Sequence, residues 1–190
     1  MLDSHFEDLG AITFPVWSGR QKYMNTVDPS DPRMDEGLED YNDVVRQLCA
    51  AAGYTGPEVH VTVDEKIVQA GCSQRRPDAH VDGHFQVSEM SWGHDGPGGT
   101  WNHCCNEVPI PRMSVIVASD VAGCIGYRGN FEGEPKNDGD LEHIRDQLGA
   151  GELLPANRGF LLSPDCVHES VRYSEPTQRG FLRIALPPIK

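Results

Sequence analysis

Short apolar segments bounded by turn-forming residues recur along the last two thirds of the chain, and they limit the possible folds more than any other feature. Runs of β-branched residues, alternating with polar residues or continuous, are typical of strands. They lie at 59–63, 67–70, 113–119, 124–127, 159–164 and 179–186. No regular strand–helix–strand alternation connects them. The pattern predicts an all-β protein with peripheral helices, whose strands form a jelly-roll barrel.

Residues 1–57 supply the parts that we expect to pack on this barrel. Residues 11–23 predict a short strand pair or an extended edge, since they contain a proline, which cannot donate to a neighbouring strand. The turn formers of 24–37 predict a surface loop or a flap over the site. From Leu38 the apolar residues follow helical spacing as far as Gly53, which can adopt the left-handed conformation that ends a helix.

Three residues form a candidate metal site. His80 and Asp82 are two positions apart, and His168 lies far downstream. Alternate side chains of an extended segment share a face, so His80 and Asp82 can bind the same ion, with His168 as the third ligand. Two histidines and one carboxylate leave the opposite side of the metal open for substrate and dioxygen, as in non-heme Fe(II) oxygenases. A His-x-Asp pair is common by chance, so the rest of the chain must support this interpretation.

The segment after His168 gives that support. Arg179 opens a final apolar strand that also carries Arg183. In this order of residues the chain resembles the 2-oxoglutarate/Fe(II)-dependent dioxygenases, in which a His-x-Asp or His-x-Glu pair, a distant His and then an Arg or Lys follow one another. The resemblance covers about residues 58–187.

The resemblance implies a double-stranded β-helix fold and the hydroxylation of an unidentified substrate, with release of succinate and CO2. It implies Fe(II) bound by His80, Asp82 and His168, and 2-oxoglutarate as co-substrate with its far carboxylate on Arg179. Arg183 has the same parity as Arg179 on the strand, so either arginine can face the barrel interior. Arg183 therefore stays open as a second candidate for 2-oxoglutarate, or as a contact of the substrate or of a buried acid.

Two other functions remain open from the sequence. A cupin-like metalloenzyme would use a ligand set such as His80, His84, Glu89 and His168, although Asp82 stands where a cupin has the second His of a His-x-His pair. A non-catalytic jelly-roll binding module would carry His80 and His168 as ordinary histidines. Metal analysis separates the binding module from the two enzymes, and succinate formation separates the two enzymes.

Four further residues are candidates for contact with the substrate. His84 is either a pocket residue or a solvent-facing histidine at the end of its strand, and Arg76 is either a contact for an anionic substrate or a surface charge. Trp92 and Trp101 lie in a glycine-rich segment, 91–103, that predicts a substrate lid or a linker. A small molecule or a peptide is the expected substrate.

Charge and composition narrow the class of partner. The net charge of −13 makes a nucleic acid an unlikely partner, because affinity for a phosphate backbone comes mainly from Lys and Arg. Positive charge is concentrated at the C-terminal end, which suits either the capture of a small anion or a chance cluster of charges on a solvated strand. The six cysteines show no zinc-site or disulfide spacing. With neither a membrane span nor a signal peptide in view, we expect a single cytoplasmic domain over residues 1–190, of open oligomeric state.

Overall fold

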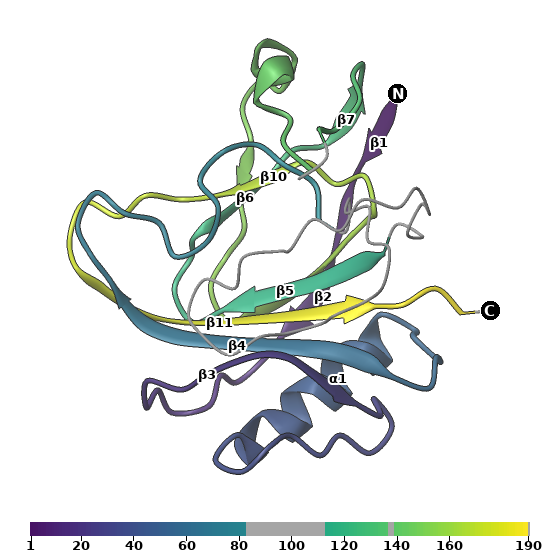
Figure 1. Ribbon diagram of the computed structural model, residues 1–190, viewed down its shortest axis with the longest axis vertical. Coiled ribbons are helices and arrows are strands. Elements are labelled where there is room, and N and C mark those ends of the chain that lie inside the picture. Colours follow the sequence, from purple (N-terminus) through teal and green to yellow (C-terminus); the bar gives the residue numbers. More distant parts are fainter. Residues whose placement is uncertain (83–112, 137–138, 190) are drawn as a thin grey trace.

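The computed structural model describes residues 1–82, 113–136 and 139–189, and strands dominate it (Figure 1). The strands are β1 (Leu2–Ser4), β2 (Phe6–Ala11), β3 (Gln21–Val27), β4 (Val59–Val68), β5 (Ser114–Ser119), β6 (Cys124–Gly126), β7 (Gly129–Phe131), β8 (Glu152–Leu153), β9 (Arg158–Leu162), β10 (His168–Ser170) and β11 (Thr177–Leu186). The helical segments are η1 (Glu39–Tyr41), α1 (Asn42–Ala51) and η2 (Glu142–Gln147). The expectation of an all-β chain with few helices is confirmed. Within the described part, no helix is long and apolar enough to cross a membrane.

Six strands form one antiparallel sheet in the order β2-β9-β5-β11-β4-β3. The long strand β11 lies between β4 and β5, so that Phe181 is opposite Asp64 on one side and Ser119 on the other. The two edge strands, β2 and β3, flank residues 12–20. The strand pair or extended edge predicted for 11–23 is therefore wrong for most of that range, because residues 12–20 belong to no strand and connect two strands at opposite edges of the sheet.

Two smaller sheets complete the structure. One has the strand order β10-β6-β8, and the other pairs β1 with β7. His80 belongs to no named strand, but its backbone forms an antiparallel bridge with His168 at the start of β10. The three-stranded sheet therefore continues through His168 into the segment that carries His80.

Eight segments pair like the two arms of one long hairpin that has been folded over. In chain order they are β4, the His80 segment, β5, β6, β8, β9, β10 and β11. The first pairs with the eighth, the second with the seventh, the third with the sixth and the fourth with the fifth. Four of them lie in the large sheet and four in the small one. Among the described residues, no strand pairing closes the two sheets into the barrel that the sequence predicted.

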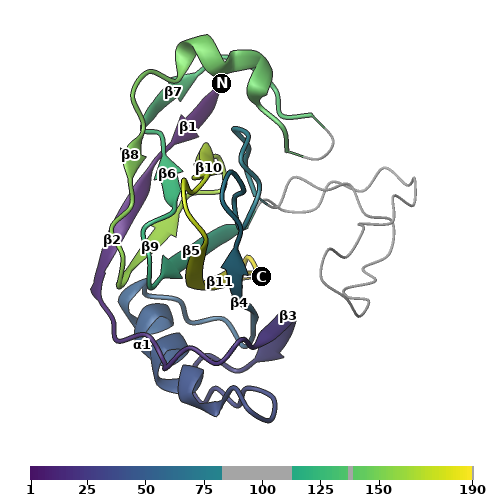
Figure 2. The ribbon, with the colours of Figure 1, turned by 90° about the vertical axis from the view of Figure 1, so that its left-hand side faces the viewer.

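Apolar side chains are buried on both faces of the large sheet. On one face, Val45 and Leu48 of α1 belong to the same core cluster as Val61, Ile116 and other sheet residues. On the other face, residues of β5, β9 and β11 pack with Cys166, near the small sheet. Figure 1 shows α1 below the large sheet, with β6 and β10 above it. Figure 2 shows β1, β7 and the green η2 segment at the end of the molecule opposite α1.

Local predictions succeed where the signal lies in neighbouring residues. The predicted helix is present, and Gly53 has the expected left-handed backbone with φ of 64°. The separation of the predicted strands 59–63 and 67–70 is wrong, because β4 runs without interruption through Asp64 and Glu65, which lie between them. Both acids are buried within the strand, where cations compensate them: Lys66 lies 3.2 Å from Asp64, and Arg20 lies 2.8 Å from Glu65.

Candidate metal centre

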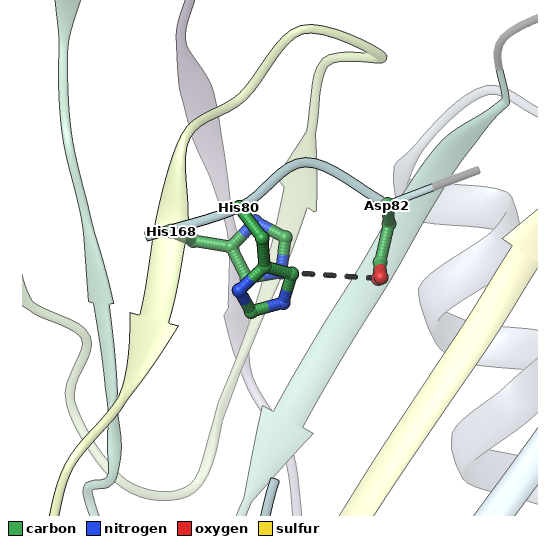
Figure 3. Close-up of side chains that lie close together, drawn as sticks. All are labelled: His80, Asp82 and His168. Atoms are coloured by element: carbon green, nitrogen blue, oxygen red, sulfur yellow. Dashed lines mark ion pairs between the residues drawn. The ribbon is translucent and has the colours of Figure 1, made fainter. Parts of the chain in front are cut away.

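His80, Asp82 and His168 come together between the two sheets (Figure 3). The His80 amide donates to the His168 carbonyl at 3.0 Å, and the His168 amide donates back at 2.9 Å. This double bridge sets the two imidazole rings side by side, with centroids 4.3 Å apart. Asp82 reaches the same place from two residues further along, and one potential ligand atom from each residue lies within 4.8 Å of the others.

Backbone carbonyls fix which nitrogen of each imidazole can bind a metal. Nδ1 of His80 lies 2.7 Å from the carbonyl oxygen of Asp78, and Nδ1 of His168 lies 3.0 Å from that of Cys166. A carbonyl can only accept, so both Nδ1 atoms must carry hydrogen, which leaves the lone pairs on Nε2. Burial, with the nearby His168, lowers the pKa of His80 to about 3, so this imidazole is neutral. Neutral imidazoles with free Nε2 atoms are the form that binds metals.

Asp82 supplies an ionised oxygen ligand. Burial raises the pKa of its carboxyl, but the charge of Arg183 more than offsets this effect, and the pKa lies below its usual value. Nε of Arg183 donates to Asp82 Oδ2 at 2.9 Å, and the same oxygen lies 3.8 Å from Nε2 of His168. Two imidazoles oriented by hydrogen bonds at their Nδ1 atoms, together with one carboxylate, could therefore hold a metal ion.

A cavity of about 470 Å³ opens beside these three residues. Both arginines that the sequence selected on β11, Arg179 and Arg183, line it, as their shared parity predicted. Arg76 also lines the cavity and lies 3.5 Å from Asp140. The remaining selected residues, His84, Trp92 and Trp101, lie outside the described residues, as does Glu89 of the cupin-like ligand set.

Arg179 and Arg183 have opposite electrostatic surroundings. Arg183 forms an ion pair with Asp82, whereas no ion pair joins Arg179 to an acid among the described residues. Arg179 is only 1% exposed, and it donates to two neutral acceptors, the carbonyl of Val121 at 3.1 Å and Oε1 of Gln74 at 2.7 Å. Burial accordingly lowers the pKa of Arg179. Burying a guanidinium that has no acid within ion-pair distance costs folding free energy. The presence of Arg179 at this position therefore needs a reason other than stability.

The chain makes room for this arginine. A side-chain carbon added to Gly123 would lie 2.9 Å from Cζ of Arg179 and would also collide with the hydroxyl of Tyr173. Sequence reasoning assigned no role to Gln74, Gly123 or the cavity-lining Arg75. The only feature of the sequence that pointed to Gln74 and Arg75 was their position just before His80. Gly123 gave no signal, because glycines in loops usually reflect turns.

Comparisons of the chain with protein-family models, with curated proteins and with solved structures return no match. The geometry of the site therefore has to indicate the function by itself.

Proposed function

We propose that this chain is an Fe(II)- and 2-oxoglutarate-dependent oxygenase that hydroxylates a small molecule or a peptide. The observation that carries the proposal is Arg179, a buried cation without an acid partner, in the same cavity as the His80–Asp82–His168 group. When bound, Fe(II) and 2-oxoglutarate supply the oxidation, in which one oxygen atom of dioxygen enters a substrate C–H bond and the other enters succinate as CO2 is released.

The different surroundings of Arg179 and Arg183 give the two arginines different proposed roles. Arg183 is already paired with Asp82, so its role is to neutralise and orient a metal ligand. Arg179 has its Nε and Nη1 engaged by neutral acceptors, which fix the plane of the guanidinium, and no acid among the described residues lies within ion-pair distance of it. A planar fork in this state suits a carboxylate, with which it can form two parallel hydrogen bonds. Arg179 is therefore the residue that binds the far carboxylate of 2-oxoglutarate.

The strand pairing supports the same proposal. Eight segments that pair first with eighth, second with seventh, third with sixth and fourth with fifth form the rolled-up hairpin of a jelly roll. We propose that the two sheets form a double-stranded β-helix in which the metal ligands come from the small sheet and the two arginines from the large one. Such an arrangement places the metal and the carboxylate site on facing walls of one cavity.

The remaining contributions come from residues that shape the cavity. His80 and His168 keep their Nδ1 hydrogens on backbone carbonyls, so their rings cannot turn away from the ion. Val117 and Phe181 form apolar parts of the wall, which limit the access of water to the oxidised C–H bond. The polar ligands and Arg179 would orient the co-substrate. The apolar wall would leave space for the substrate on the open side of the metal.

Metal binding is the first test. His80→Ala, Asp82→Ala and His168→Ala are each expected to abolish tight binding of Mn(II), measured by calorimetric titration in the absence of oxygen. The matched control is His143→Ala, which removes an exposed histidine on η2. Urea unfolding of each variant separates a lost ligand from a lost fold, since both histidines are buried and Asp82 is the ion-pair partner of Arg183. If one of the three variants binds Mn(II) as tightly as the parent, that residue is not a ligand.

Succinate formation is the second test and separates the proposed function from its alternatives. The Fe(II)-loaded protein should form succinate from 2-oxoglutarate, and a substrate should increase the rate. Metal binding without any consumption of 2-oxoglutarate would favour a cupin-like metalloenzyme. Absence of metal binding would favour a binding module.

A further inference from the structure

Arg75 is a second arginine in the cavity whose charge is weakly compensated. It lies in the irregular segment between β4 and His80, and its side chain is 36% exposed. Its Cζ lies 5.5 Å from the centroid of the Phe181 ring, and Cζ of Arg179 lies 5.4 Å from the same centroid. Both guanidinium groups therefore border one aromatic ring of the cavity wall, one near the surface and one buried.

Asp64 compensates Arg75 only in part. The shortest distance between them, from Nη1 to Oδ2, is 3.8 Å, and Nζ of Lys66 is nearer to the same oxygen at 3.2 Å. Nε2 of Gln21 donates to the other carboxylate oxygen at 2.8 Å. Two cations, Lys66 and Arg75, therefore share one oxygen of Asp64, and Arg75 is the more distant of the two.

Two weakly compensated arginines next to one ring repel each other unless an anion lies with them. Within a cavity that has restricted contact with water, this repulsion is screened less than on an open surface. Arg179 offers a fixed, buried donor pair, and Arg75 offers a guanidinium at the rim that bends inward over Phe181. The two differ in exposure, so they can approach one small anion from its inner and its outer side.

We propose that Arg75 and Arg179 together bind one carboxylate, so that the cavity selects 2-oxo acids that carry a second, remote carboxylate. This inference rests on the proposed function, because it takes the 2-oxo acid to bind at the metal. It adds a residue on the outer side of the carboxylate, which excludes water from the ion pair with Arg179. Selection between a dicarboxylate and a monocarboxylate 2-oxo acid then depends on both arginines.

The experiment compares 2-oxoglutarate with pyruvate, which has the same 2-oxo acid group and lacks the remote carboxylate. Both are titrated calorimetrically into the anaerobic Mn(II)-loaded protein. The parent should prefer 2-oxoglutarate, and Arg75→Gln should reduce that preference by about tenfold or more, since charge-assisted hydrogen bonds are the strong ones. Its affinity for pyruvate should not change. Arg75→Lys, which keeps the charge without the fork, should give an intermediate preference.

The control is Arg33→Gln, which removes an arginine whose side chain is 85% exposed in the loop after β3. It should leave both affinities unchanged. An unchanged preference in Arg75→Gln would overturn the inference, and so would a parent protein that does not distinguish the two acids. If Arg75→Gln keeps the preference and succinate is still formed, the inference fails and the proposed function stands. If the preference depends on Arg75 but no succinate is formed, the proposed function fails and the carboxylate site stands.

Discussion

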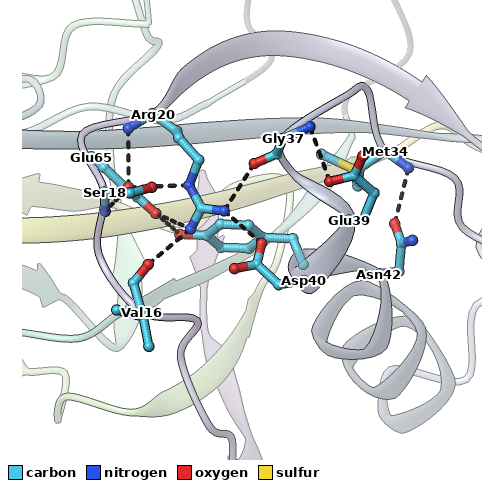
Figure 4. Close-up of polar contacts among 10 residues, drawn as sticks. Val16, Ser18, Arg20, Met34, Gly37, Glu39, Asp40, Asn42 and Glu65 are labelled. Atoms are coloured by element: carbon cyan, nitrogen blue, oxygen red, sulfur yellow. Dashed lines mark hydrogen bonds and ion pairs between the residues drawn. The ribbon is translucent and has the colours of Figure 1, made fainter.

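Two arginines with opposite surroundings, the partly buried Arg20 and the buried Arg179, give a direct test of which one the fold needs. Arg20 lies in a network in which its Nη2 is 2.8 Å from Glu65 and its Nη1 is 2.7 Å from Asp40 (Figure 4). It also donates to the backbone carbonyls of Val16 and Gly37. Arg179 has no acid partner among the described residues. We predict that Arg20→Met strongly lowers the free energy of unfolding, whereas Arg179→Met changes it little and removes the binding of 2-oxoglutarate.

The magnitude for Arg20 follows from the carboxylate that it leaves behind. The Glu65 side chain is 1% exposed, and removing one partner of a buried ion pair costs about 3–5 kcal/mol. The hydroxyl of Tyr41 and the backbone amide of Ser18 still donate to Glu65, so we expect the lower end, about 3 kcal/mol.

The pKa of Glu65 gives a similar figure. Burial raises this pKa, but hydrogen bonds from Arg20, with smaller contributions from the Ser18 amide and the Tyr41 hydroxyl, together outweigh burial and bring it from 4.5 to about 2. At 1.36 kcal/mol per pKa unit, this difference corresponds to about 3 kcal/mol.

For Arg179→Met, the expected change in the free energy of unfolding is the difference between two opposing effects. Replacing a buried charge by an apolar side chain of similar length is often neutral or stabilising, because the cost of desolvation disappears. Against this, Val121 and Gln74 each lose a hydrogen bond, worth about 1 kcal/mol apiece. We therefore expect the ligand-free Arg179→Met protein to unfold within about 1 kcal/mol of the parent.

Urea unfolding at pH 7 and at acidic pH measures both effects. The folded-state pKa of Glu65 is depressed, so its contribution is complete above pH 4.5 and is lost as the pH falls towards 2. The difference between the parent and Arg20→Met should accordingly shrink in that range, while the difference for Arg179→Met should not follow Glu65. A loss of stability in Arg179→Met as large as in Arg20→Met would refute the reasoning, because Arg179 would then be a structural residue.

Two further predictions concern the position of the Arg179 guanidinium. Gln74→Glu places a carboxylate 2.7 Å from Nη1 of Arg179, so an internal ion pair should replace the co-substrate and weaken 2-oxoglutarate binding about tenfold or more, with unchanged Mn(II) affinity, in calorimetric titrations. Gly123→Ala should displace Arg179 and Tyr173 and weaken 2-oxoglutarate binding in the same assay. Unaltered 2-oxoglutarate binding in both variants would contradict the assignment of Arg179 to the carboxylate.

The strands that sequence patterns predicted correctly are those whose signal is local. The apolar run at 114–119 is strand β5, and the segment that follows it contains β6. Strand β4 was divided wrongly at Asp64 and Glu65, because two adjacent acids resemble a turn when their partners are unknown. Those partners, Gln21 and Arg20, lie in and just before the edge strand β3, on a different part of the chain. A long-range compensation of this kind leaves no pattern in neighbouring residues.

The same distinction holds within the site. That His80 and Asp82 share a side follows from their spacing, and the order of residues up to Arg179 gave His168 its role. Arg75 and Arg76 are adjacent in an irregular segment where alternation of faces does not apply, and only Arg76 was selected. The structure sets both in the cavity wall, and it brings Gln74 there as well.

The arginines of this protein differ in whether an acid lies close enough to pair with them. Arg20 and Arg183 each meet an acid from a distant segment, Glu65 and Asp82 respectively, and each of these pairs is complete without a ligand. Arg179 is as deeply buried as a core residue and meets only neutral oxygen atoms. Desolvation of this guanidinium is costly, and no acid among the described residues lies within ion-pair distance to offset it in full. Under the proposed function, a carboxylate bound in the cavity offsets this cost, and Arg179 is then the position at which the chain gives up stability for binding.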